Sequence, residues 1–173
     1  MKKITSISFG LLVIVCLVTL TAGQAAAEVL ASSSRANSFI RTAPSANANV
    51  NLPLNNAGTT SLVFYTNQPN QKVIVSFNAE CAVRSTTNVF TNYLEIDTFI
   101  DGVILSPTND GGTALCTGHG NNTLANWTSV VSIAERIVPN PGLHRVVVRV
   151  NGVGLSSAGE GWRIDDSSTV VWK

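Results

Sequence analysis

The chain contains two histidines, and neither lies in a catalytic motif. Nucleophilic catalysis needs a nucleophile, a base and a group that orients the base. His144 alternates with Val146 and Val148, which predicts a partly buried, hydrogen-bonded histidine on a strand. His119 lies between two glycines in a predicted loop, and the Gly-x-Ser-x-Gly elbow of serine hydrolases is missing. We therefore predict no catalytic residue of this kind.

Glu95 and Asp97 form a carboxylate pair whose spacing could serve glycoside hydrolysis. They are two residues apart on a predicted strand, so their side chains share one face about 7 Å apart. Neighbouring outward carboxylates on a strand are more often a solvated face, and small sandwiches seldom offer a deep cleft. A small glycoside hydrolase stays an alternative, and we expect the protein not to be an enzyme.

Acidic, glycine-rich loops supply the oxygen ligands that calcium prefers. Glu160, Asp165 and Asp166 follow one another around a Gly-rich loop, and Asp110 lies in a second loop, Asn-Asp-Gly-Gly. EF-hand spacing is missing, and Asp and Asn also form turns and cap backbone groups without a metal. Calcium is the one cofactor that these loops suggest, with the four carboxylates as candidate ligands.

Three aromatic residues could form a stacking platform for a sugar ring. Trp127 and Trp162 lie near predicted loop–strand junctions, and Tyr93 faces the polar side of its strand. Tryptophan is highly buried on average, so at least one of the three tryptophans is expected in the core. Tyr93, Trp127 and Trp162 are the candidate glycan-binding residues, and an extracellular glycan or protein is the candidate partner.

The first 27 residues have the three parts of a secretory signal peptide. Lys2 and Lys3 precede an apolar run over 9–20, and Ala25-Ala26-Ala27 provides a cleavage site. The run is shorter than the roughly 20 apolar residues that span a bilayer. We expect cleavage after Ala27 and secretion to the periplasm, cell surface or medium, with no membrane contact afterwards.

Cys81 and Cys116 remain after this cleavage. An oxidising compartment favours a disulfide between them, worth roughly 4 kcal/mol in the chain-entropy model. Metal ligation is the alternative, because His119 lies near Cys116, but no second pair of ligands accompanies it.

Charged residues make up only 12% of the chain, about half the usual share. Two of the 11 basic residues lie in the predicted signal peptide, whereas all 10 acidic residues follow it, so the mature net charge is about −1. A basic cluster is missing. Nucleic-acid binding therefore lacks its electrostatic footprint.

Period-2 alternation of apolar and polar residues predicts a succession of strands. From Val73 to Val83 the odd positions are apolar, which places Cys81 on a buried face. Asp101-Gly102 between two apolar runs predicts a hairpin with a type I′ turn. Further strands are expected at 61–66, 128–138, 143–150 and 168–172, with Val131, Ile133 and Ile137 in the core.

Short strands separated by turns predict an all-β fold: an antiparallel β-sandwich, jelly-roll-like, with one disulfide. The sandwich domain is expected over 61–173. Residues 28–60, rich in Ala, Ser and Asn, indicate a loose N-terminal arm with one edge strand near 38–41.

Several strand sequences carry a resemblance to known proteins. In order they are VSFNAEC (75–81), YLEID (93–97), DG (101–102), PGLHRVVV (141–148) and IDDSS (164–168). This series resembles a set of uncharacterised secreted bacterial proteins with a single jelly-roll-like domain. It is also similar to the tumour-necrosis-factor and complement globular-head fold, in which a G-x-H-x-V-x-V strand precedes the closing strand. The resemblance implies a binding or assembly role, with a homotrimer as one form, and brings no catalytic residues.

These observations together predict a non-enzymatic secreted or cell-surface module for binding or self-assembly. A carbohydrate-binding module and a small glycoside hydrolase are the alternatives.

Overall fold

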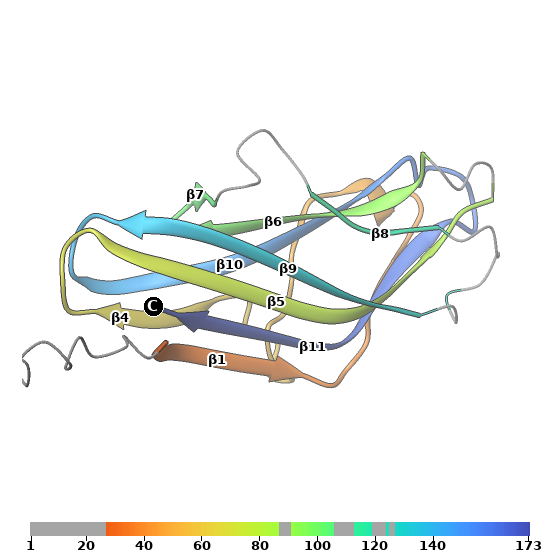
Figure 1. Cartoon of the computed structure of the whole chain (residues 1–173). Coiled ribbons are helices and arrows are strands. Elements are labelled where there is room, and N and C mark those ends of the chain that lie inside the picture. The colour runs from red at the N-terminus through yellow and green to blue at the C-terminus, as the bar shows by residue number, and fades with distance from the viewer. Residues whose placement is uncertain (1–26, 87–90, 106–112, 119–123, 125–126) are drawn as a thin grey trace, which may run out of the picture.

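The computed structural model describes residues 27–86, 91–105, 113–118, 124 and 127–173. These residues form a sandwich of two β-sheets with one short 3-10 helix, η1 (Ser45–Asn47) (Figure 1). The strands are β1 (Val29–Arg35), β2 (Phe39–Thr42), β3 (Val50–Asn51), β4 (Leu62–Thr66), β5 (Gln71–Arg84), β6 (Tyr93–Ile100), β7 (Val103–Ile104), β8 (Thr113–Thr117), β9 (Thr128–Val138), β10 (Gly142–Val153) and β11 (Gly161–Trp172).

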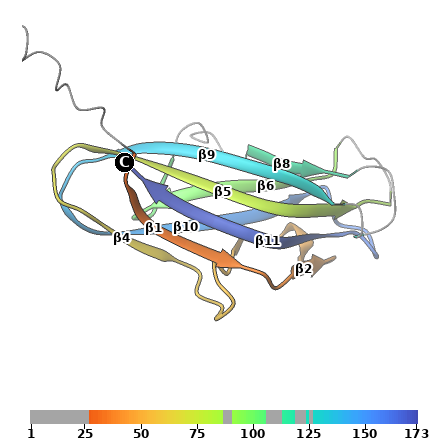
Figure 2. The ribbon, with the colours of Figure 1, turned by 60° about the horizontal axis from the view of Figure 1, so that its bottom comes forward.

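All strand pairs in the two sheets are antiparallel, as predicted. The first sheet, called sheet I here, has the order β1-β11-β5-β9, and β2 also pairs with β11. The second, sheet II, has the order β3-β10-β6-β7, with β4 beside β10 and β8 beside β6. Figure 2 shows the strands of sheet I side by side as one layer.

The alternation in β5 positions the core as the sequence predicts. The odd residues from Val73 to Val83 are buried, and they face the inward residues of sheet II. Trp162 of β11 is 0% exposed, and its indole Nε1 donates to the Ala46 carbonyl at 2.8 Å. The predicted hairpin is also confirmed, because Asp101 (φ 52°) and Gly102 (φ 79°) have the two positive φ angles of a type I′ turn.

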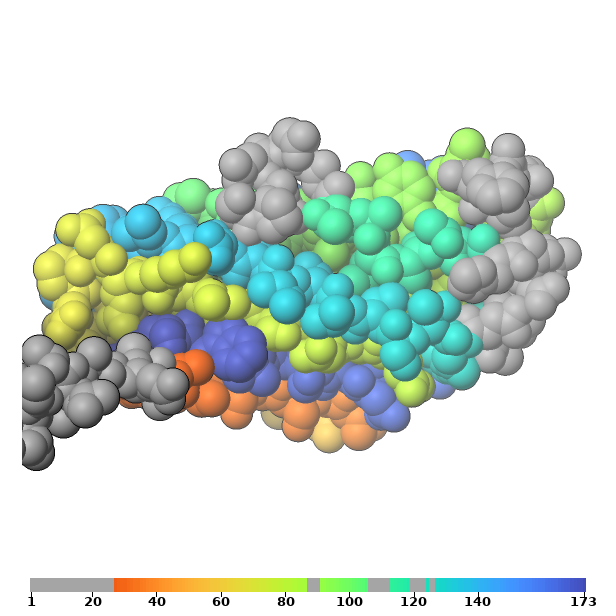
Figure 3. Space-filling view, viewed as in Figure 1, coloured from red at the N-terminus to blue at the C-terminus, as the bar shows by residue number. Residues whose placement is uncertain are grey.

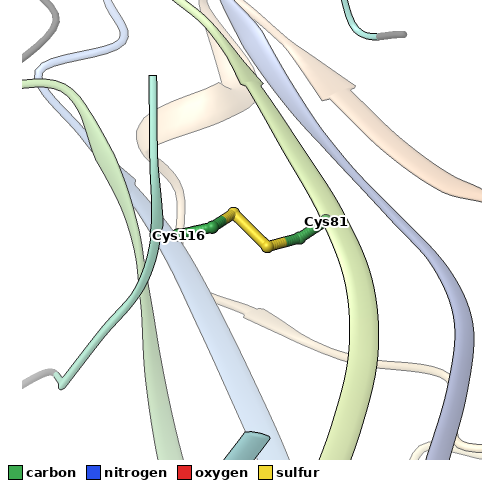
Figure 4. Close-up of a disulfide and its surroundings, with 2 residues drawn as sticks. All are labelled: Cys81 and Cys116. Carbon is green, nitrogen blue, oxygen red and sulfur yellow. A yellow bond between two sulfur atoms is a disulfide. The ribbon is translucent and has the colours of Figure 1, made fainter. Parts of the chain in front are cut away.

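The predicted disulfide between Cys81 and Cys116 is confirmed (Figure 4). It connects β5 of sheet I to β8 of sheet II across the core, with the two Cα atoms 6.5 Å apart. The bridge therefore fixes the two layers to each other at one end of the sandwich.

The segment expected to be a loose arm is instead part of both sheets. β1 and β2 pair with β11 of sheet I, and β3 pairs with β10 of sheet II. Leu52 and Leu54 are almost fully buried. The Ala/Ser-rich composition misled the prediction because backbone pairing needs no apolar side chains, and Ser33 Oγ adds a bond of 2.7 Å to the Leu54 carbonyl. β2 does confirm a strand near 38–41.

The predicted core residues of β9 face the solvent, so that prediction was wrong. Val131, Ile133 and Ile137 are 59%, 56% and 62% exposed, whereas Ala134 and Val138 are buried. β9 has apolar residues in both alternating sets, so its pattern did not determine which set faces inward. These larger side chains lie on the outer surface of sheet I, where β9 appears in cyan in Figure 3.

The predicted signal peptide lies almost wholly outside the described residues, and its cleavage stays a prediction. In the described part of the chain, no helix is long and apolar enough to cross a membrane.

Candidate functional site

The outer face of sheet I contains an open depression of about 380 Å³. Its lining comes from β5, β9 and β11, which pair side by side in the sheet. Figure 3 shows the face on which these strands lie. The lining residues are Asn78, Ala79, Glu80, Ser129, Val130, Val131 and Asp166.

A β-bulge in β11 shapes one side of this depression. Asp165 is paired with Glu80, whereas Ser168 is paired with Asn78, so β11 has one more residue than β5 over this stretch. The extra residue bends the strand locally. Asp166 adopts φ 36°, a left-handed conformation that Asp tolerates better than most residues, and its side chain is exposed beside the depression.

Trp127 lies on the same outer face, next to the depression. It precedes Ser129 by two residues, so in extended chain the two side chains share one face about 7 Å apart. Trp127 is 37% exposed, and the Arg163 guanidinium carbon lies 4.3 Å from the centroid of the indole ring. The indole thus has one stacked partner from β11 and still offers surface to a ligand.

A hydrogen-bond network holds Arg163 under this indole. Its Nη2 donates to Asp165 Oδ2 at 2.8 Å, and its Nε donates to Ser38 Oγ at 2.9 Å. Ser38 Oγ in turn donates to Asp165 Oδ2 at 2.7 Å. The network ties the start of β2 to β11, so the guanidinium is positioned before any ligand arrives.

The site therefore combines an aromatic ring with amide, carboxylate and hydroxyl groups around an open hollow. Aromatic rings pack against the apolar C–H faces of sugars, and planar polar side chains exchange hydrogen bonds with sugar hydroxyls. Of the sequence-predicted residues, the structure brings Trp127, Asp165 and Asp166 together here.

Trp162 cannot serve as a sugar platform, which corrects the prediction for this residue. It is 0% exposed and packs against Phe39, with ring centroids 5.7 Å apart. Its place in the alternation of β11 turns it inward, whereas Arg163, the next residue, faces outward. The expectation that at least one tryptophan belongs to the core is confirmed by this residue.

Tyr93 lies elsewhere, on the outer face of sheet II, in β6. It is half-buried, and its hydroxyl donates to Glu95 Oε1 at 3.4 Å. It therefore belongs to a different surface from Trp127, and the two residues cannot stack on the same sugar ring.

Glu95 and Asp97 also lie on the outer face of sheet II, and both are bonded to neighbours on β10. Asp97 Oδ2 forms an ion pair of 2.7 Å with Arg149 Nη2, and Glu95 Oε2 accepts from Asn151 Nδ2 at 3.2 Å. The Arg149 guanidinium also covers the Phe99 ring at 4.4 Å. The two carboxylates thus stabilise cross-strand contacts between β6 and β10.

The three predicted calcium ligands that the structure describes, Glu160, Asp165 and Asp166, do not form a metal site with one another. Glu160 is 0% exposed, and its carboxylate accepts hydrogen bonds from the backbone N–H groups of Ser157 at 2.8 Å and Thr86 at 3.0 Å. Asp165 is bonded to Arg163, Asp166 lines the depression, and Asp110 lies outside the described residues. Where the chain is described, no three His, Cys, Asp or Glu residues group as a metal site would require. Calcium stays a prediction without structural support.

His144 is buried and hydrogen-bonded, as the sequence predicts. Its Nδ1 lies 2.7 Å from Asp101 Oδ2, and its Nε2 lies 3.0 Å from Thr66 Oγ1. This order of groups is that of a hydrolase triad, but Thr66 is only 1% exposed and no substrate can reach it. His119 lies outside the described residues.

The turn residue Asp101 has an altered acidity. Burial acts to raise its pKa, but hydrogen bonds from His144 and from the Arg145 backbone N–H, together with nearby positive charge, lower the pKa below its usual value. The contacts with His144 and Arg145 link this turn to β10.

Glu80, Asn78 and Arg163 are site residues that the sequence reasoning missed. A signal for Arg163 was present, because Trp162 and Ile164 alternate with Arg163 and Asp165. The predicted last strand began only at residue 168, so this alternation was not used. No local signal places Glu80 and Asp166 at the same depression, because their positions depend on the pairing of β5 with β11 and on the β11 bulge.

The fold and this surface define a β-sandwich module with an open polar and aromatic site on one outer face. No family model and no curated protein matches the chain. The solved structure of infectious bursal disease virus Gx strain is similar over 85% of this chain, at 11% identity and a TM-score of 0.40. This chain spans 31% of the length of that viral chain.

Two carbohydrate-binding modules are also similar to the chain. For a family 35 module from Clostridium thermocellum, identity is 12% and the TM-score 0.33, over 84% of this chain and 98% of that one. For the C-terminal CBM6 of a marine laminarinase from Zobellia galactanivorans, the values are 10% and 0.29, over 78% and 99%. Likenesses of this size carry no argument about function.

Proposed function

We propose that this protein is a non-enzymatic binding module that holds a saccharide on the outer face of sheet I. The observation that carries the proposal is the position of Trp127, which is exposed two residues before Ser129 of the 380 Å³ depression and has the guanidinium of the fixed Arg163 over its indole. An aromatic side chain that keeps 37% of its surface exposed beside polar groups favours a ligand with both apolar and hydroxyl-bearing surface.

Each part of the site has a role in this proposal. Trp127 provides the stacking surface, and Asn78 offers an amide that can donate to and accept from hydroxyl groups. Val131 gives the hollow an apolar wall. Because the hollow is open to solvent, an internal part of a saccharide chain can lie across it, and binding does not require a chain end.

The expected location agrees with such a ligand. The Cys81–Cys116 disulfide is typical of proteins that fold in an oxidising compartment, and polysaccharides are abundant outside cells. Secretion itself rests on the predicted signal peptide.

The test compares two aromatic residues on opposite sheets. Trp127→Ala should lower the affinity for a bound polysaccharide at least tenfold, whereas Tyr93→Ala should leave it unchanged. Affinity electrophoresis over a polysaccharide panel, followed by calorimetry on the best ligand, measures both, with circular dichroism as the folding control. Equal loss in the two variants, or binding that survives in folded Trp127→Ala, would contradict the proposal.

Self-assembly is a second candidate, favoured by one observation. In the described part of the chain, β9 is an edge strand paired only with β5, and it exposes Val131, Ile133 and Ile137. A second copy carries the same edge, and antiparallel pairing about a two-fold axis would bring identical apolar side chains together. Light scattering tests it: a dimer that Ile133→Lys converts to monomer would support it, and a monomeric parent protein would contradict it. The homotrimer that the sequence resemblance implies stays a prediction.

A further inference from the structure

We infer that the depression on sheet I selects saccharides that carry ammonium groups, such as 2-amino sugars, over saccharides that carry carboxylates. This inference rests on the proposed function, because it concerns the ligand class of the same site. Its basis is the pair Glu80 and Asp166, whose side chains line the hollow from β5 and from the β11 bulge.

The charge around the depression is not balanced. Asp165 is compensated by Arg163 in direct contact at 2.8 Å. The almost fully buried Arg35 also attracts Asp165, an effect that opposes the lowering of the Arg35 pKa by burial. In the described residues, by contrast, neither Glu80 nor Asp166 lies within ion-pair distance of a basic side chain. Within this part of the chain, two carboxylates therefore line the hollow without a paired cation.

Two basic residues, Lys72 and Arg84, share the outer face of β5 with Glu80. Arg84 lies four residues beyond Glu80, about 13 Å along the strand, which exceeds the screening length of about 8 Å in physiological salt. Lys72 is paired with Glu135 of β9 at 2.7 Å, and it precedes Glu80 by eight residues along β5. At the rise of a strand this separation is about 26 Å, beyond the range of effective attraction in physiological salt. The uncompensated charge at Glu80 and Asp166 is thus a local property of the depression.

A ligand that covers the depression removes water from these carboxylates, so the charge of the ligand determines its affinity. An ammonium group would form charge-assisted hydrogen bonds with them. A neutral sugar would donate ordinary hydroxyl hydrogen bonds, and a uronic acid would bring a like charge against them. We expect affinity to fall in that order.

The side chains fit this role geometrically. Asp166 is held out by its left-handed backbone at the bulge, and Glu80 is the strand residue paired with the adjacent Asp165. Trp127 and the apolar wall can take the sugar ring while the carboxylates take its substituent. The Trp127 ring thus contributes affinity for the sugar ring, and the carboxylates contribute selectivity for its charged substituent.

The experiment measures calorimetric affinity of the full mature chain for three hexasaccharides: glucosamine, N-acetylglucosamine and galacturonic acid. Mildly acidic, low-salt buffer keeps the glucosamine amines protonated, and chelator is present throughout. The glucosamine oligomer should bind about tenfold more tightly than the N-acetylated one, and galacturonate most weakly. Added salt should reduce the preference, because it screens the charges.

Two variants assign the preference to the carboxylates. Asp166→Asn keeps a residue that tolerates the left-handed backbone, and Glu80→Gln keeps the size of the side chain. Each should bring the affinity ratio of glucosamine to N-acetylglucosamine oligomers close to one. Glu95→Gln on sheet II is the matched control and should leave the ratio unchanged.

The outcomes separate the inference from the proposed function. If the neutral or anionic oligomer binds with an affinity equal to or higher than that of the glucosamine oligomer, and this binding depends on Trp127, the inference is wrong. The proposed function is then still supported. A preference that Asp166→Asn and Glu80→Gln do not reduce also overturns the inference. If no oligomer binds, or binding does not depend on Trp127, both the inference and the site proposed on sheet I are wrong.

Discussion

Two groups of carboxylates, one on the outer face of each sheet, differ in the partners they have. On sheet II, Asp97 is paired with Arg149, Glu95 is bonded to Asn151, and the Phe99 ring is covered by the Arg149 guanidinium. On sheet I, Glu80 and Asp166 line a hollow without such partners in the described residues, and an exposed tryptophan stands beside them.

This difference separates a surface that stabilises the fold from the surface that we propose binds a ligand. Carboxylates that are paired across neighbouring strands stabilise the sheet and have little left to offer a ligand. Solvated carboxylates around a hollow contribute little to stability and stay available to a ligand, which is the role proposed for Glu80 and Asp166. The contrast predicts that substitutions on sheet II affect folding, whereas substitutions around Trp127 affect binding.

The largest expected effect comes from comparing a buried tryptophan, Trp162, with an exposed one, Trp127. Trp162→Ala should lower the free energy of unfolding by about 3–5 kcal/mol, because it empties a fully buried site and leaves the Ala46 carbonyl without its donor. Trp127→Ala should cost less than about 1.5 kcal/mol, since its side chain is partly exposed. Urea unfolding measures both, and equal losses would contradict the assignment of Trp162 to the core and Trp127 to the surface.

The disulfide should have the next largest effect. Cys81→Ser with Cys116→Ser should reduce the free energy of unfolding by about 4 kcal/mol in the chain-entropy model, because the bridge closes a loop with a separation of 35 residues. The melting temperature should fall by at least several degrees in a calorimetric scan. Free thiols titrating in the exported protein, or an unchanged melt, would show that the bridge does not form in solution.

Removing one cation from each sheet tests the comparison directly. Arg149→Met should cost about 1–3 kcal/mol, because it removes an ion pair to Asp97, whose side chain is only 12% exposed, and uncovers the Phe99 ring. Lys72→Met, on sheet I, should cost less than about 1 kcal/mol, because both side chains of its ion pair are more than half exposed. The prediction fails if chemical unfolding ranks the two variants in the reverse order.

The smallest expected effect is the pH dependence contributed by Asp101. Its pKa is lower in the folded chain than in the unfolded chain, so it stabilises the fold above its unfolded pKa of about 3.9. This stabilisation is lost as the pH falls through the folded pKa. Asp101→Asn should therefore be less stable than the parent at neutral pH, and the difference should shrink below about pH 4. Urea titrations across this range would contradict the account if the difference grew on acidification.

The sequence predicted the elements whose local pattern agrees with their environment. The alternation of β5 determined its buried face and placed Cys81 for the bridge, and Asp101-Gly102 specified a turn from backbone preference alone. β9 could not be predicted in the same way. It has apolar residues in both alternating sets, and which set faces inward depends on its partners.

The candidate site was predictable only in part. Trp127 and Asp166 were identified by residue type, but types alone also selected Trp162, which is core, and Glu160, whose carboxylate receives backbone hydrogen bonds between two loops. Glu80 and Asp166 line the same depression because distant strands pair antiparallel and β11 has a one-residue bulge. Neither the pairing nor the bulge can be predicted from the local sequence.

The most direct test of the binding site on sheet I uses the indole and backbone amide NMR signals of the mature chain during saccharide titration. We predict that the NMR signals of the Trp127 indole and of the Asn78, Glu80 and Asp166 amides shift in proportion to bound ligand. The signal of the buried Trp162 indole should not shift. Shifts confined to Tyr93, Phe99 and their neighbours on sheet II would contradict it.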